Sequence, residues 1–140
     1  MSITHSVEIN APRKQVFGLY ADIASWPEWD SETLAVDLPG LQVGAAGWLK
    51  PRQGPRATIR VAEVMEDSSF TVEGRLPLCR MHFGHELEDD GNRTIATHWV
   101  RFTGLLAPLF RRLIGTGIDR TLPQTLAGLK RVSEEKSTHG

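Results

Sequence analysis

One long apolar stripe in the last third of the chain constrains the fold more than any other feature. Between Gly104 and Val132 apolar side chains recur at spacings of three and four residues, the period of a helix buried along one side. The stripe consists of Leu106, Leu109, Phe110, Leu113, Ile114, Ile118, Leu122, Leu126 and Leu129. A helix of this length is a rod of roughly 40 Å. Burying such a rod takes a wide, curved sheet, and that geometry favours a cavity between sheet and helix.

The chain before this stripe alternates apolar and polar residues, which predicts mostly strands. We expect a first strand over residues 3–10, followed by two short helices. Asn10 and Asp22 are the expected caps of these helices. The second helix is expected to stop before Trp26-Pro27, because a residue that precedes proline avoids the helical region.

Six further strands are expected between these helices and the final helix, with tight turns that indicate an antiparallel meander. Two of them span about residues 32–38 and 46–50. The next strand breaks its alternation at Val64, which predicts a bulge near Ala62-Glu63. The predicted element order is therefore β-α-α-β-β-β-β-β-β-α, with about seven strands.

The last two strands form a hairpin around Asp90-Gly91, a dipeptide that favours tight turns. We predict that Glu88 lies opposite Arg93, which sets His85 and His98 diagonally on one inward face. The same face then holds Cys79, Met81, Phe83, Leu87, Ala96, Val100 and Phe102. Arg80, His82, Glu86, Trp99 and Arg101 fall on the opposite, outward face.

Composition limits the class of protein further. The 140 residues are expected to form one domain, residues 1–140, with 16 basic and 17 acidic side chains and therefore no basic face for nucleic acid. A single cysteine excludes a disulfide framework. The sequence has no pattern of a signal peptide and no run that could insert into a membrane, so the cytoplasm is the default location. We expect a monomer or weak homodimer, and the polar tail 133–140 to fray.

Four segments resemble the START/Bet v 1-like superfamily, also called SRPBCC. Residues 22–30 read DIASWPEWD and follow the segment 11–17, as in that superfamily. Residues 83–87 and 102–108 resemble the last strands and helix start of its polyketide cyclase/dehydrase-like branch. The resemblance implies an α+β helix-grip fold: a curved antiparallel sheet around a long C-terminal helix, with a hydrophobic cavity between them. Members of the superfamily bind lipids, sterols or polyketides, and a minority catalyse cyclisation, dehydration or hydrolysis.

His85 and His98 are the candidate catalytic residues, because two inward imidazoles can move protons or orient a polar group of a ligand. The alternative is that both are core histidines with satisfied hydrogen bonds. His82 and His85 lie three residues apart on a strand and point to opposite faces, so they cannot share a metal ion. No metal site and no cofactor motif is predicted.

The predicted ligand-binding residues line the expected cavity, and the tryptophans among them could equally be core. They are Trp29, Trp48, Gly74, Met81, Phe83, His85, His98, Phe102, Phe110, Ile114 and Ile118. Trp26, before its proline, is more typical of core. Arg75 lies nearest the expected cavity among the arginines, which are otherwise typical of solvated surface.

Three functional hypotheses follow from these residues together with the resemblance. The first is a protein that binds a small hydrophobic molecule, lipid- or polyketide-like, in the cavity. The second is an aromatase/cyclase- or dehydrase-type enzyme that acts on a polyketide-like substrate in the same place. The third is an interaction module with a filled core that uses an outward patch around His82 and Trp99.

Overall fold

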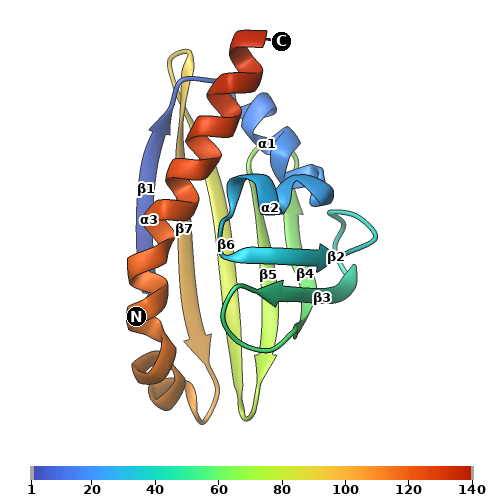
Figure 1. The fold of residues 1–140 in the computed structure, drawn as a ribbon, viewed down its shortest axis with the longest axis vertical. Helices are drawn as coiled ribbons and strands as arrows, with labels where there is room; N and C mark the ends of the chain where they lie inside the picture. Colours follow the sequence, from blue (N-terminus) through green and yellow to red (C-terminus); the bar gives the residue numbers. More distant parts are fainter. Residues whose placement is uncertain (1, 140) are drawn as a thin grey trace.

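A curved sheet of seven antiparallel strands holds one long helix in the structure, a computed structural model that describes residues 2–139 (Figure 1). The strand order across the sheet is β1-β7-β6-β5-β4-β3-β2. The strands are β1 Ser2–Ile9, β2 Thr33–Asp37, β3 Ala46–Pro51, β4 Ala57–Met65, β5 Ser69–Leu76, β6 Cys79–Asp90 and β7 Arg93–Thr103. The helices are α1 Arg13–Ala21, the 3-10 turn η1 Ile23–Ser25, α2 Trp26–Trp29 and α3 Ala107–His139. The expected α+β helix-grip architecture is confirmed.

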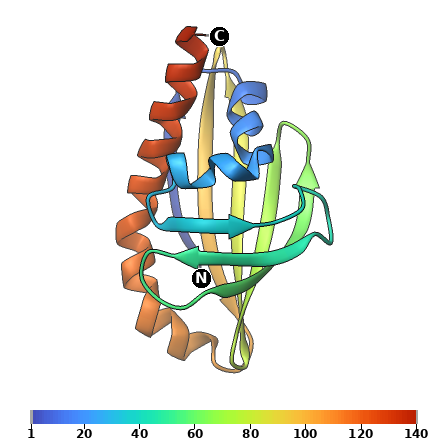
Figure 2. The same ribbon diagram turned by 45° about the vertical axis from the view of Figure 1, so that its right-hand side comes forward.

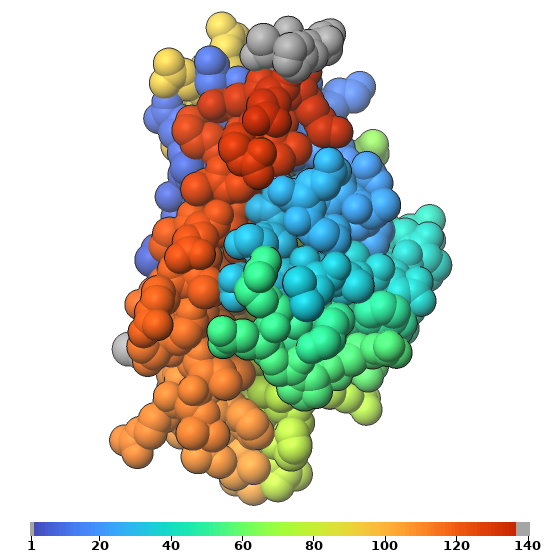
Figure 3. Space-filling model, viewed as in Figure 1, coloured from blue at the N-terminus to red at the C-terminus, as the bar shows by residue number. Residues whose placement is uncertain are grey.

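Two groups of elements cover the concave face of the sheet. Helix α3 runs along the β1 and β7 side, and α1 and α2 lie beside its C-terminal half (Figures 1 and 2). Strands β2 and β3 cross in front of the longer strands because the sheet curls strongly (Figure 2). In the space-filling view these elements hide the middle of β6 and β7 from this side (Figure 3). The interior of the protein is therefore the space between the concave face and this cover.

The β6–β7 hairpin has a register two residues away from the predicted one. Asp90 pairs with Arg93, so the turn is Gly91-Asn92 and not Asp90-Gly91. Gly91 is the first central residue of this two-residue turn and has a φ of 67°. Turns with a positive φ at this position favour glycine. Since the side-chain period of a strand is two, a shift of two residues keeps every side chain on its predicted face. The bulge predicted near Ala62-Glu63 is confirmed by a register shift between Val61 and Glu63.

The two short helices differ from the prediction at their boundaries. Pro12, and not Asn10, occupies the N-cap position of α1, and Asp22 caps η1 without a side-chain hydrogen bond. The chain does not leave the helical region before Pro27: Trp26 has φ −52° and ψ −45°, and α2 continues through the proline. Pro27 lies in the first turn of α2, where its missing N–H has no intrahelical partner to lose.

Helix α3 buries only part of its predicted stripe. Leu126, Leu129 and the following Val132 are buried in a cluster with α1, α2 and β4 to β7. Leu106, Phe110, Ile118 and Leu122 are half-buried against a second cluster, formed by Cys79, Met81, Val100, Phe102 and Ala107. Leu109, Leu113 and Ile114 are exposed, so the prediction that they face the sheet is wrong. The apolar residues cover a wider arc of the helix than the sheet can reach.

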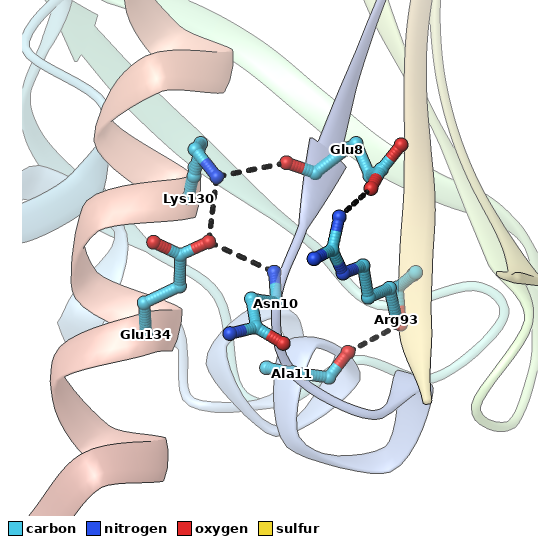
Figure 4. Close-up of polar contacts among 7 residues, drawn as sticks. Glu8, Asn10, Ala11, Arg93, Lys130 and Glu134 are labelled. Atoms are coloured by element: carbon cyan, nitrogen blue, oxygen red, sulfur yellow. Dashed lines mark hydrogen bonds and ion pairs between the residues drawn. The ribbon is translucent and has the colours of Figure 1, made fainter. Parts of the chain in front are cut away.

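The C-terminal half of α3 is tied to β1 by polar contacts. Lys130 Nζ donates to the backbone oxygen of Glu8 at 3.0 Å, and Glu134 accepts from the backbone N–H of Asn10 at 2.8 Å (Figure 4). Arg93 forms an ion pair with Glu8 beside them (Figure 4). The predicted fraying from Ser133 onward is wrong up to His139, because the helix continues to that residue and Ser133 is buried. Gly140 lies outside the described residues.

None of the described helices is both long enough and apolar enough to cross a bilayer.

Candidate functional site

Tyr20 is the centre of an aromatic cluster inside the protein. Helix α1 directs its side chain against the concave face, and the residue is fully buried. The rings in edge or tilted contact with it, at centroid distances of 4.9 to 6.0 Å, belong to Phe17, Trp29, Phe70, His85 and His98. Burial raises the pKa of the Tyr20 hydroxyl far above its ordinary value, so the phenol is neutral and acts as a hydrogen-bonding group.

His98 on β7 shares a hydrogen bond with this phenol. The Tyr20 hydroxyl lies 2.8 Å from Nε2 of His98, and both residues are buried. Burial, and next the neighbouring His85, lower the pKa of His98 well below its usual range. Both partners are therefore neutral near pH 7, and a single proton bridges them.

His85 on β6 lies directly opposite His98, not diagonally as predicted. The two ring centroids are 4.6 Å apart in an edge-to-face arrangement. The ring of His85 stacks flat on Phe70, with a centroid distance of 3.9 Å and an interplanar angle of 1°. Nδ1 of His85 lies 3.2 Å from the backbone oxygen of Phe70. Stacking and hydrogen bond together hold the imidazole in one orientation.

The tautomer of His85 follows from this hydrogen bond. Burial lowers the pKa of His85 to about 4, so the ring is neutral at pH 7. A backbone oxygen only accepts, so the single ring proton is on Nδ1. Nε2 of His85 therefore keeps its lone pair, and no described residue donates a hydrogen bond to it. The site thus contains a fixed, neutral nitrogen base with an unused acceptor.

A third histidine lies at the same level of the sheet. His5 on β1 pairs with His98 in the strand register, so His85, His98 and His5 form a row across three neighbouring strands. Nε2 of His5 is 2.6 Å from Asp119 on α3, and both side chains are partly exposed. The row therefore runs from the buried aromatic cluster to a partly exposed carboxylate at the helix.

Two side chains in the middle of the concave face are less completely buried than their neighbours. Phe83 and His85 are only half-buried, although Met81 and Leu87, on the same face of β6, are buried. Phe83 touches both hydrophobic clusters, and the half-buried Phe110 of α3 packs on the second of them. The apolar interior thus consists of two clusters, and the half-buried Phe83 contacts both of them.

The structure brings most of the predicted cavity residues to the concave side. Gly74 is buried there, and a Cβ on it would lie 3.6 Å from Cε2 of Phe83. Met81 and Phe102 are buried in the second cluster, with Phe110 and Ile118 packed against it. Trp29 lies on α2 and is buried in the aromatic cluster. Trp26, expected to be core, is core.

Three candidates do not belong to this interior. Trp48 pairs with Thr58 in the middle of β3 and lies on the outward face, where the Arg56 guanidinium is 4.1 Å from its ring centroid. Ile114 is exposed on the side of α3 that the sheet does not reach. Arg75 is exposed on the outward face of β5. The residues of β3 are at most half-buried on either face. The sequence of such a strand does not show which face points inward, so the prediction for Trp48 was wrong.

The outward patch around His82 and Trp99 has internal partners. Trp99 covers Gly84 and donates from Nε1 to Glu86 at 2.8 Å, and His82 Nε2 lies 2.8 Å from the Thr103 hydroxyl. Both aromatic residues are half-buried. The patch is therefore part of the sheet's own packing.

Sequence reasoning missed the roles of Tyr20, Phe70 and His5. All three residues occupy positions in the apolar pattern of their helix or strand. At such positions a sequence pattern predicts only that a tyrosine or phenylalanine is part of the core. His5 alternates with Ile3 and Val7 along β1, but only the strand order β1-β7-β6 brings it beside His98. In the described part of the chain, no group of three or more His, Cys, Asp or Glu side chains could hold a metal ion.

The comparisons with known proteins agree with this architecture. The sequence profile of the family described as "Polyketide cyclase / dehydrase and lipid transport" matches residues 1–134. The chain therefore belongs to this family. No curated protein matches the sequence.

Several solved structures share the fold at low sequence identity. Protein MLL2253 from Mesorhizobium loti superimposes with a TM-score of 0.80 at 17% identity, covering 96% of this chain and 98% of that one. Protein jhp0584 from Helicobacter pylori gives 0.79 at 13% identity, covering 95% and 88%. BexL, a di-domain ARO/CYC protein from the BE-7585A biosynthetic pathway, gives a TM-score of 0.72 at 19% identity. The superposition covers 94% of this chain but 45% of BexL.

Proposed function

We propose that the protein binds a small hydrophobic molecule, lipid- or polyketide-like, between the concave face of the sheet and α3. The observation that carries this proposal is His85: its ring is fixed and neutral, its Nε2 has no donor among the described residues, and it keeps some accessibility inside an apolar body. An unused acceptor in such surroundings is costly unless water or a ligand satisfies it.

The apolar surroundings support this choice of ligand. Phe83 on the sheet and Phe110 and Ile118 on the helix present half-buried apolar side chains to the interior. Pockets for small molecules combine such walls with a few polar groups that set orientation. The family description, which includes polyketide cyclases, dehydrases and lipid transport, agrees with an apolar ligand of this kind.

The chemistry of His85 narrows the ligand class further. Nε2 accepts and does not donate, so it selects a ligand group that carries a hydrogen: a hydroxyl, a phenol or an enol. Tyr20 and His98 already form a hydrogen bond with each other. We therefore expect the polar group of the ligand to contact His85 rather than this pair. We expect a mostly apolar molecule with one such group.

Native mass spectrometry of freshly purified protein tests the proposal directly. A retained small molecule, identified after extraction, would have the apolar body and the hydroxyl-type group described above. His85→Ala should reduce its retention, whereas His82→Ala, on the outward face of the same strand, should not. An empty protein that also fails to bind the fluorescent probe anilinonaphthalene sulfonate would contradict the proposal.

The alternative is an aromatase/cyclase- or dehydrase-type enzyme acting in the same interior. The neutral lone pair on Nε2 of His85 favours it, because a general base must be unprotonated and positioned before it accepts a proton. The test is whether wild-type protein changes the mass or absorbance of the co-purified molecule on incubation. Conversion that His85→Gln abolishes while binding persists would establish the enzyme; an unchanged molecule favours the carrier.

A further inference from the structure

The end of the molecule where α3 begins is built from two turns that touch each other. The turn between β5 and β6 contains Leu78, and the turn between β7 and α3 contains Gly104 to Leu106. The backbone N–H of Leu106 donates to the oxygen of Leu78 at 3.0 Å. These turns and the first turns of α3 form the lower end of the molecule in Figures 1 and 3. We refer to this region as the basal end.

Leucines of the basal end are exposed to solvent. The exposed fractions are 65% for Leu78, 80% for Leu105, 46% for Leu109 and 65% for Leu113. Leu109 and Leu113 are four residues apart in the first turns of α3, so they share one side of the helix, and Leu105 lies in the turn directly before it. Scattered exposed leucines are ordinary, but a cluster at one end of a molecule marks a surface with a partner.

Leu78 is also held in a backbone conformation that does not suit leucine. It follows Pro77 in a two-residue turn and has a φ of 53°, a position where glycine or asparagine is usual. A branched side chain in this left-handed region costs free energy. Packing does not explain this strain, because the Leu78 side chain is exposed. A leucine kept at such a position is consistent with a function of its exposed side chain.

The basal end carries positive charge without nearby carboxylates in its own segments. Residues 74–85 and 94–118 contain no Asp or Glu at all, although the whole chain has a net charge of −1. Arg75 and Arg80 line a groove of about 420 Å³ together with Leu76, Leu78, Cys79 and Leu105. Arg80 lies 3.9 Å from Glu73, whereas Arg75 and Arg112 make no ion pair with any described residue.

We propose that the basal end docks on the surface of a lipid bilayer that contains anionic lipids. Exposed leucines insert at the headgroup boundary, and the arginines contact lipid phosphates, which is the pattern of proteins that lie on a membrane. A second copy of this chain fits less well, because a two-fold interface would bring two sets of Arg75, Arg80 and Arg112 together, and residues 74–85 and 94–118 supply no carboxylate to pair with them. This inference does not depend on what the interior binds.

Sedimentation with vesicles tests the docking surface. The purified protein is mixed with vesicles of phosphatidylcholine alone, or of phosphatidylcholine and phosphatidylglycerol in equal parts, at low and high salt. We expect binding to the anionic vesicles that weakens as salt rises. Leu109→Ser with Leu113→Ser should lower the partition coefficient about tenfold or more, and Arg75→Gln with Arg112→Gln about fivefold per arginine.

Matched variants separate docking from unfolding. Met65→Ser removes an exposed apolar side chain at the end of β4, and Arg131→Gln removes an exposed arginine at the other end of α3. Both positions lie far from the basal end, so neither change should alter vesicle binding. Leu78→Gly should bind vesicles more weakly although it relieves the backbone strain and raises stability. Equal binding to neutral and anionic vesicles, or no binding to either, would overturn the proposal. So would a dimer, found by ultracentrifugation, that the leucine variants abolish.

Discussion

The hydroxyl of Tyr20 lies 2.8 Å from Nε2 of His98, and this hydrogen bond joins the first helix to the last strand inside the protein. Both residues are buried, and each is the other's only hydrogen-bond partner through a side chain in the described part of the chain. The pair lies next to His85, whose ring it helps to confine. Stability and the proposed ligand binding therefore depend on the same few side chains.

Tyr20→Phe should destabilise the fold, because it leaves a buried nitrogen of His98 without its partner. The expected loss is about 1–3 kcal/mol in the free energy of unfolding. Urea denaturation followed by circular dichroism measures it. Combining Tyr20→Phe with His98→Leu should cost less than the sum of the two single changes, because no polar atom is then stranded. Strict additivity would mean that the hydrogen bond contributes nothing.

Stability should fall as the pH is lowered from about 6.5 toward 4. Burial lowers the pKa of His85 to about 4 and that of His98 in the same direction, so in this window the unfolded chain binds more protons than the folded one. The stabilisation is complete above the unfolded pKa and is lost on acidification. His85 alone should contribute on the order of 3 kcal/mol to the change. Urea midpoints measured across this range should show a smaller slope in His85→Gln, and an unchanged slope would contradict the assignment.

Two glycines of α3 should respond oppositely to alanine. A Cβ on Gly128 would lie 2.1 Å from the backbone oxygen of Trp29, so Gly128→Ala must push α3 away from α2 at a cost of roughly 2 kcal/mol or more. Gly117 has nothing within 4 Å of the added atom. Gly117→Ala should therefore stabilise the helix by up to about 1 kcal/mol. Thermal unfolding of both variants provides the comparison, and two shifts in the same direction would contradict the packing described here.

Ser133→Ala should raise stability. The Ser133 hydroxyl is buried in α3 and has no hydrogen-bond partner among the described residues. Removing an unsatisfied polar group of this kind restores about 1 kcal/mol. The midpoint of urea unfolding should move upward, with Ser133→Val as the test of whether space permits a larger apolar group. A decrease for alanine would show that a partner satisfies the hydroxyl in solution.

The faces of the strands were predictable even where the register was not. The hairpin turn was placed one residue too early, which moved the pairing of β6 and β7 by two residues. His85 and His98 nevertheless remained on the inward face, because side chains of a strand alternate with a period of two. The error changed only their relation, from diagonal to directly opposite, and so made their contact closer than expected.

The candidate site was only partly predictable, because several of its residues come from elements that are far apart in the sequence. Tyr20 belongs to the first helix, Phe70 to β5 and His98 to β7. Nothing in their spacing along the chain indicates that their rings meet. Arg75, expected near the cavity, lies outside because β5 presents it to the other face of the sheet.

Local periodicity in the sequence determined that this chain forms a curved meander and one long final helix, since repeats of two and of three to four apolar residues act over short distances. Tertiary structure alone decided which part of the helical stripe meets the sheet, leaving Leu109 and Leu113 exposed and Leu126 and Leu129 buried. It also decided that Tyr20, His85 and His98 share one interior. The physical reason is that burial depends on which surfaces the folded chain brings together, and the sheet is too narrow to cover every apolar side chain of the helix.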